Sequence, residues 1–249
     1  MKPSRKTSLL LAAISLTFSH PALHAAELTW DVTDNGATIE AGSGDWNSSD
    51  PLNIVWNDAG TNLAWTQTDT ITPLNSAIFA GTSGSEDAYV ITLASQMATS
   101  DLTFNSSGYK ITGSTLSLAT SPTTNGTITV ADNTTAAIDS TIYYSHNRAA
   151  LISVGSGGVL NLGGGTTAGN NAQLTFSGAG TVNLTAGNYE STIARIDVAN
   201  VNQTGGVYKF SAGNNTGINL GRSAGQDVNY EISGGELNVS GLAAGYYLG

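Results

Sequence analysis

Short stretches of alternating apolar and polar residues recur in the second half of the chain. Five of them begin with glycine: GTITV from 126, GVLNL from 158, GTVNL from 180, GVYKF from 206 and GELNV from 235. The third and fifth residues of each stretch are apolar, and the fourth is polar. STLSL at 114–118 follows the same pattern with serine in place of glycine. A period of two places the apolar residues on one side of an extended chain, so each stretch predicts a β-strand with one buried face.

The recurrence of one stretch predicts a repeating fold. Gly158, Gly180, Gly206 and Gly235 follow one another at intervals of 22, 26 and 29 residues, about the length of one turn of a β-solenoid. Stacked turns cover one another, and each buried aliphatic or aromatic side chain contributes roughly 1.5–3 kcal/mol. We expect the glycines to provide the positive φ of each corner. An antiparallel β-sandwich also uses short alternating strands and is the competing fold.

Residue composition divides the chain near residue 110. All four tryptophans precede this point: Trp30, Trp46, Trp56 and Trp65. We therefore predict a β-rich capping region at 27–110 and solenoid repeats at 111–249. The end of a solenoid exposes strand edges and apolar core, which large aromatic side chains cover well. A platform that stacks on sugar rings is the functional alternative for the same four tryptophans.

The first 26 residues have the features of a secretory signal peptide. Three basic residues precede an apolar run of ten residues at 9–18, and Ala25 and Ala26 provide small residues near the cleavage point. This run is too short for a transmembrane helix, and no later stretch reaches that length. We expect the protein to be exported and to lie outside the cell or on its outer surface.

Removal of the signal peptide makes the chain strongly acidic. Of eight basic and 18 acidic residues, five basic and all 18 acidic ones remain, which gives a formal net charge of −13. Such a surface repels nucleic acid and anionic lipid, so neither is expected as a partner. The acidity can equally serve to keep a repetitive β-protein soluble. The chain contains no cysteine, which excludes disulfides and thiolate metal sites.

The order of motifs in the first half resembles one known family. TWD at 29–31, GSGDW at 42–46, AIFAG at 77–81, YVITL at 89–93 and LTFNSSGYKITGSTLSL at 102–118 are similar to the N-terminal region of bacterial autotransporter-associated β-strand repeat proteins. In that family, the repeats form right-handed parallel β-helices in large secreted or surface proteins. The resemblance therefore implies a right-handed parallel β-helix and a passenger-like role at the cell surface.

Two departures from the family pattern concern the C-terminus. The sequence shows no C-terminal translocator and no short sorting anchor, and it stops at Gly249 within a repeat-like stretch. We expect either that the chain is truncated at its C-terminus or that the family's export route does not apply.

No group of residues in the sequence predicts catalysis. The cluster YYSHNR at 143–148 contains His146, the only histidine after the signal peptide, but no motif of a serine or zinc hydrolase accompanies it. Enzymes built on β-helices use clustered Asp, or Asp with Arg, on one face. Here Asp197 lies two residues from Arg195 and Asp227 lies five from Arg222, while no Asp–Asp pair occurs.

The glycine-rich segments do not predict a cofactor. GSGG at 155–158 and GGGTTAG at 163–169 are not followed by the Lys-Ser/Thr of a phosphate-binding loop, and they predict turns. GSGD at 42–45 resembles a calcium-binding glycine–aspartate repeat, but it occurs once. We therefore expect no catalytic residues, no cofactor and no metal.

Together these features favour a noncatalytic secreted or cell-surface protein with a structural or adhesive role. Its expected partners are polysaccharides or other cell-surface or matrix components. One alternative is a carbohydrate-binding module that uses the four tryptophans, and another is a polysaccharide lyase or hydrolase. Exposed tryptophans in a groove favour the first, converging carboxylates favour the second, and buried tryptophans favour the structural role.

Overall fold

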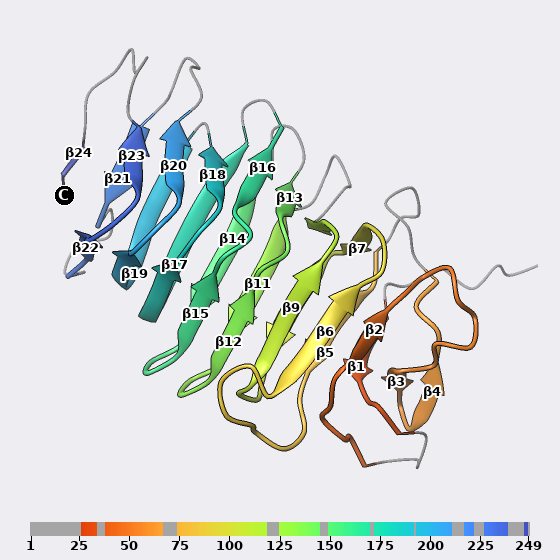
Figure 1. Cartoon of the computed structure of the whole chain (residues 1–249). Coiled ribbons are helices and arrows are strands. Elements are labelled where there is room, and N and C mark those ends of the chain that lie inside the picture. Colours follow the sequence, from red (N-terminus) through yellow and green to blue (C-terminus); the bar gives the residue numbers. More distant parts are fainter. Residues whose placement is uncertain are drawn as a thin grey trace, which may run out of the picture.

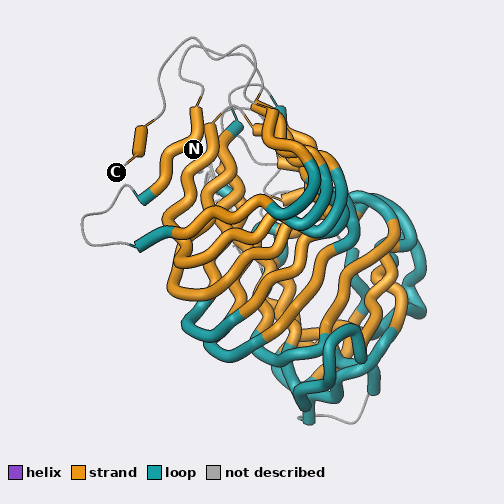
Figure 2. The backbone as a smooth tube through the Cα atoms, turned by 60° about the vertical axis from the view of Figure 1, so that its left-hand side comes forward, coloured by secondary structure: helices purple, strands orange, loops and turns teal. Residues whose placement is uncertain are grey.

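Every regular element in the described part of the chain is a β-strand (Figure 2). The computed structural model describes residues 26–33, 38–66, 74–118, 125–144, 149–169, 172–191, 193–210, 217–221, 227–238 and 247–248. The predicted signal peptide lies outside these residues, apart from Ala26, and so do His146, Arg148 and Arg222. Over the described ranges, no helix has the length and apolar character needed to cross a membrane. The all-β prediction is confirmed, and most of the strands pair in parallel.

Three parallel ladders of strands run along an elongated stack (Figure 1). Along the first ladder, the strands are β1 (Glu27–Trp30), β5 (Ser76–Phe79), β8 (Asp101–Phe104), β11 (Gly126–Val130), β14 (Ala149–Val154), the first halves of β17 (Gln173–Leu184) and β19 (Ile193–Gln203), β21 (Gly217–Leu220) and β24 (Tyr247–Leu248).

The second ladder is joined to the first because β17 and β19 run through both. Its strands are β2 (Gly44–Trp46), β6 (Tyr89–Leu93), β9 (Tyr109–Gly113), β12 (Thr135–Ile138), β15 (Val159–Leu162), the second halves of β17 and β19, and β22 (Asn229–Ile232).

The third ladder is a separate sheet of seven strands. They are β7 (Met97–Thr99), β10 (Leu116–Leu118), β13 (Ile142–Tyr144), β16 (Thr166–Ala168), β18 (Asn188–Ser191), β20 (Val207–Phe210) and β23 (Glu236–Asn238). Consecutive strands of the chain visit the three ladders in turn, as β8, β9 and β10 do. We call one such set a rung.

The apolar core lies between the ladders, and each rung adds side chains to continuous columns. In the first ladder, Leu102, Ile128, Ile152, Phe176 and Ile196 pair in succession, and all five are buried. Each column residue lies on its neighbours in adjacent rungs, about 4.8 Å away. Burial of a side chain therefore depends on the presence of both neighbouring rungs.

The repeated stretches of the sequence do not all occupy one position in the rung. GTITV forms β11 of the first ladder, and GVLNL and GTVNL belong to the second. The leading glycines of GVYKF and GELNV directly precede β20 and β23 of the third ladder. The predicted alternation is confirmed, since Ile128, Leu160, Val182 and Tyr208 are buried. The interval of 26 residues between Gly180 and Gly206 is therefore a change of ladder and not one full turn.

The prediction that every leading glycine has a positive φ is correct at only two of the five stretches. Gly206 and Gly235 have φ values of 70° and 77°, whereas the other three leading glycines do not fall in this region. At Gly180, a Cβ would lie 2.4 Å from the carbonyl oxygen of Gly155. Glycine is required there because the neighbouring rung approaches too closely for a side chain.

Antiparallel pairing closes the N-terminal end of the first ladder. β3 (Trp56–Asp58) pairs with β1, and β4 (Thr61–Leu63) pairs with β3 through a two-residue turn. Parallel pairing already includes β1 and β2 and continues across residue 110 without a break, because β9 pairs with both β6 and β12. The division into a capping region and repeats at residue 110 stays a prediction.

Candidate functional site

The four tryptophans form one aromatic cluster at the N-terminal end of the stack. Trp30 ends β1, Trp46 ends β2, Trp56 begins β3 and Trp65 follows β4. None of them has exposed surface. The ring centroids of Trp46, Trp56 and Trp65 lie 4.7–4.8 Å apart, and those of Trp30 and Trp56 lie 5.2 Å apart, edge to face. These are favourable aromatic packing distances, so the cluster forms part of the core.

The cluster continues into the ladders through Phe79. The Phe79 ring lies 5.8 Å from that of Trp56 and stacks on Phe104 at 5.2 Å. The indole nitrogen of Trp30 donates a hydrogen bond to the carbonyl of Gly42 at 3.0 Å. The indole nitrogens of the other three tryptophans are buried without an acceptor. Because no indole face reaches solvent, this placement gives no support to the predicted glycan contact, which stays a prediction.

A buried polar network holds the antiparallel strands against the cluster. Asp31 has no exposed surface, and its carboxylate accepts hydrogen bonds from the backbone of Thr33 and Glu40 and from Asn57 Nδ2. Asn57 Nδ2 also donates to Asn62 Oδ1 at 2.8 Å, and Asn62 Nδ2 donates to the carbonyl of Asp31 at 3.1 Å. A buried carboxylate needs such donors, so these contacts tie β3 and β4 to β1.

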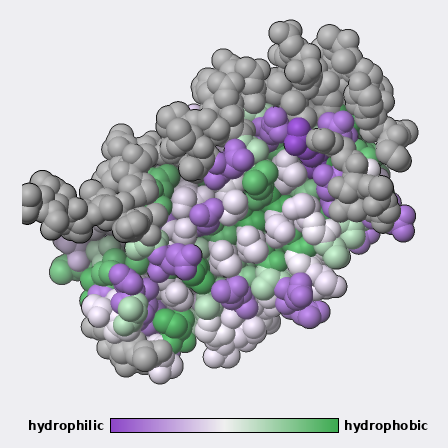
Figure 3. Space-filling model, turned by 180° about the vertical axis from the view of Figure 1, so that it is seen from behind, coloured by the Kyte–Doolittle hydropathy of each residue, from purple (hydrophilic) through white to green (hydrophobic). Residues whose placement is uncertain are grey.

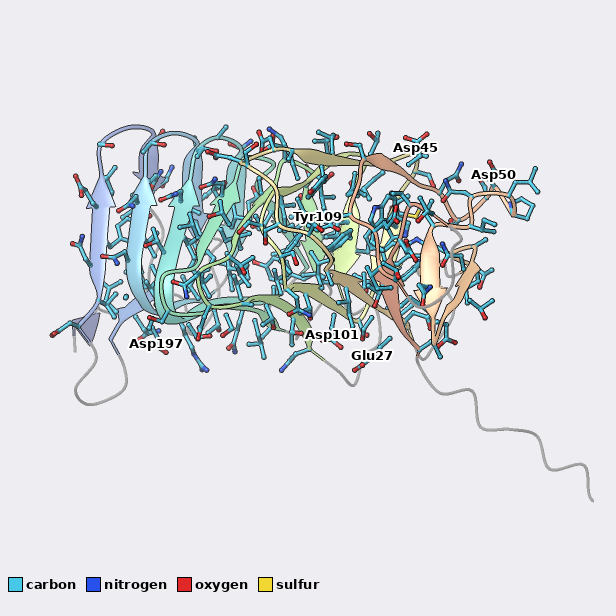
Figure 4. The ribbon with its side chains drawn as sticks, turned by 90° about the horizontal axis from the view of Figure 1, so that it is seen from below. Glu27, Asp45, Asp50, Asp101, Tyr109 and Asp197 are labelled. Atoms are coloured by element: carbon cyan, nitrogen blue, oxygen red, sulfur yellow. The ribbon has the colours of Figure 1, made fainter. Side chains whose placement is uncertain are left out.

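Of the two Asp–Arg pairs considered in the sequence, the structure describes both members only for Arg195 and Asp197. Arg195 and Asp197 project from the same side of β19, and their neighbours in β17 are Thr175 and Ser177. In Figure 4, Asp101 and Asp197 project from one side of the stack at well-separated positions. Asp101 accepts hydrogen bonds from the hydroxyls of Ser76 and Thr127.

Lys110 makes a structural contact with two carboxylates. Lys110 Nζ lies 2.9 Å from Asp87 and 2.8 Å from Asp139. Hydrogen bonds to Asp139 and then Asp87 raise the pKa of Lys110. Asp227 is described, but its suggested partner Arg222 is not. Among the described residues, no group of three or more His, Asp or Glu could hold a metal ion.

The second ladder carries a row of outward-facing asparagines, which the sequence pattern alone did not identify as a group. Asn161, Asn183 and Asn202 occupy the same register position in three neighbouring rungs. Asn202 Nδ2 donates to Asn183 Oδ1 at 3.0 Å, and Asn183 Nδ2 donates to Asn161 Oδ1 at 2.7 Å. Asn161 Nδ2 in turn donates to Glu86 Oε1 at 2.9 Å. We call these three asparagines the amide stripe.

Buried tyrosines of the second and third ladders form part of the core. Tyr109, Tyr144 and Tyr189 donate hydrogen bonds to the backbone carbonyls of Ala80, Glu190 and Leu162, respectively. Burial raises the pKa of these three phenols, and that of Tyr208, above the usual value. The neutral phenols act as structural donors.

The chain is similar to an adhesin over nearly its whole length. It is 30% identical over 245 residues to the adhesin BmaC autotransporter of Brucella suis biovar 1 (strain 1330), a match that covers 96% of this chain and 6% of that protein. No protein-family model matches the chain. No solved structure matches it. The chain is thus similar to a short part of a much longer autotransporter adhesin.

Proposed function

We propose that the protein is a noncatalytic, passenger-like adhesive element at the cell surface or outside the cell. The observation that carries this proposal is the similarity to an autotransporter adhesin across 96% of the chain. The acidic, cysteine-free composition and the stacked parallel strands support it.

The proposed architecture is a right-handed parallel β-solenoid whose N-terminal end is capped by the tryptophan cluster. It is supported by the regular visits of consecutive strands to three ladders and by the antiparallel pairing of β3 with β1. In this architecture the outer faces are available for contact along the whole length of the stack, because the apolar side chains point inward.

Engineered disulfides test this architecture, because the natural chain has no cysteine. Thr129 and Ser153 are register partners in β11 and β14, so their Cα atoms lie at about 4.8 Å, within disulfide range. The double variant T129C/S153C should oxidise readily without loss of folding. The control T129C/S177C joins positions two rungs apart and should stay reduced. Equal oxidation of both pairs contradicts the stacked register.

Adhesion itself is tested with beads that carry the purified chain. We expect these beads to be retained on epithelial monolayers or immobilised matrix under flow, several-fold above beads that carry an unrelated protein of similar acidic charge. Retention equal to that of the control beads on every surface would overturn the adhesive role. The matched charge is essential, because it removes nonspecific electrostatic effects from the comparison.

A further inference from the structure

The amide stripe has hydrogen-bonding capacity that its own contacts do not use. Each asparagine amide has two N–H donors and two acceptor lone pairs on its oxygen. Within the stripe, Asn183 uses one donor toward Asn161 and one lone pair from Asn202. All three side chains are partly exposed. Each amide can therefore offer a donor and an acceptor to a ligand on the outer face, repeated about every 4.8 Å.

The surroundings of the amide stripe are uncharged over three rungs. The outward residues of β15 and of the second halves of β17 and β19, with the position that follows each, are Val159, Asn161, Gly163, Thr181, Asn183, Thr185, Asn200, Asn202 and Thr204. None of these residues carries a charge, although the chain has a formal net charge of −10. We call this surface the neutral grid.

Charged residues mark the two ends of the neutral grid. On the N-terminal side, Glu86 accepts the last hydrogen bond of the amide stripe, and Asp139 pairs with Lys110. On the C-terminal side, the register partner of Asn202 is Glu231. Figure 3 shows the face opposite to that of Figure 1, on which hydrophilic and hydrophobic residues are interspersed with residues of intermediate hydropathy.

The chemistry of the neutral grid selects its ligand. A surface of amides and hydroxyls without cations does not attract phosphate, sulfate or carboxylate groups. It also has no exposed aromatic ring, so stacking does not contribute. An extended chain of neutral hydroxyl groups fits it, because hydroxyls both donate and accept hydrogen bonds. Weak contacts repeated along one polymer give useful avidity.

We propose that the neutral grid binds a neutral polysaccharide laid along the stack and that the amide stripe provides the main contacts. This proposal rests on the adhesive role proposed above and names its partner. It differs from the prediction made from the sequence, because the contacts come from Asn161, Asn183 and Asn202 and not from the buried tryptophans.

The test is a sedimentation assay of the purified full chain with insoluble polysaccharides. Microcrystalline cellulose and chitin are the neutral probes, and cross-linked polygalacturonate is the anionic one. The variant N183A/N202A removes two amides and should weaken binding to the neutral probe about tenfold. The control S153A/S177A removes two hydroxyls from the outer face of the first ladder and should bind as the wild type does. Circular dichroism checks that both variants fold.

A second variant keeps the proposal testable if the double asparagine variant unfolds. Thr181→Val keeps the shape and strand propensity of the residue and removes one hydroxyl of the neutral grid beside the amide stripe. It should weaken binding two- to fivefold. Binding that resists both changes, in folded variants, overturns the site.

The bead assay tests the adhesive role, and the sedimentation assay tests the polysaccharide site on the neutral grid, so the two proposals can fail separately. Retention of the beads on cells together with no binding to either neutral probe overturns the neutral grid as a polysaccharide site and leaves the adhesive role intact. A preference for polygalacturonate also overturns it. Binding to cellulose or chitin that N183A/N202A weakens supports it, whether or not the beads adhere to the cells chosen.

Discussion

The N-terminal end and the middle of the stack bury their cores in different ways. At the end, four large indoles pack irregularly, and antiparallel strands close the edge of the first ladder. In the middle, columns of mostly aliphatic residues repeat once per rung, and the backbones of neighbouring rungs approach closely at glycine corners. Stability at the end therefore depends on a few side chains, whereas in the middle it depends on many similar ones and on the corners.

The largest effect is expected from removing the centre of the tryptophan cluster. Trp56 contacts Trp30, Trp46, Trp65 and Phe79. Trp56→Ala should lower the free energy of unfolding by about 3–5 kcal/mol because it leaves a large cavity. Urea unfolding followed by circular dichroism measures the loss. Leu52→Ala, at a side chain that is 85% exposed, is the control and should change stability by less than about 0.5 kcal/mol.

A corner of the middle rungs should be sensitive to a single added methyl group. Gly178 has a φ of 101°, and a Cβ there would lie 2.1 Å from the carbonyl oxygen of Val154. Gly178→Ala should therefore cost about 1–3 kcal/mol. The exposed neighbour Ala179 provides the control, since Ala179→Ser adds an atom in open solvent. Equal stability of the two variants in urea would contradict the close approach of the rungs.

Alkaline pH should weaken the middle of the stack through its buried tyrosines. Burial raises the pKa of Tyr189 in the folded state, so its stabilising contribution is complete below the unfolded pKa of about 10 and is lost as pH rises above it. Between the unfolded pKa and the folded pKa of Tyr189, this phenol should cost the wild type about 1.4 kcal/mol of stability per pH unit. The Tyr189→Phe variant should lack this loss. Urea midpoints from pH 8 to pH 11 measure both slopes. Parallel slopes for the variant and the wild type would argue against a buried phenol.

The smallest effect distinguishes two tryptophans within the same cluster. Trp30 Nε1 donates to Gly42, whereas Trp65 Nε1 is buried without an acceptor. Both Trp30→Phe and Trp65→Phe lose ring volume, but only the first also loses a hydrogen bond. We expect Trp30→Phe to be less stable than Trp65→Phe by about 1 kcal/mol. The opposite order would mean that ring volume alone decides stability in the cluster.

The alternation of residues was the most informative part of the sequence. It correctly identified Val182 and Leu184 as buried and Asn183 as outward-facing, because strand periodicity is a local property. The ladder to which each stretch belongs depends on loop lengths, and β17 carries a register shift between Gly178 and Thr181. That shift helps to align Asn183 with Asn202, which is why the amide stripe could not be recognised from spacing.

The antiparallel strands β3 and β4 could not be predicted from the sequence for a different reason. Their two-residue turn has positive φ at Ala59 and Gly60, and alanine is a weak signal for such a turn. The buried network of Asp31, Asn57 and Asn62 joins residues that are 26 and 31 positions apart. Polar residues at these distances are indistinguishable in sequence from exposed loop residues.

Because the hydrogen bonds between rungs run along the stack axis, the stack is mechanically weakest in that direction. A pull on one terminus of the chain, directed along the stack axis, strains the hydrogen bonds of the outermost rung before those of the next. Each detached rung of the length between Ile128 and Ile152 would release about 80 Å of extended chain. A tether built in this way lengthens in steps under load, and it absorbs work at each step while the remaining rungs stay folded.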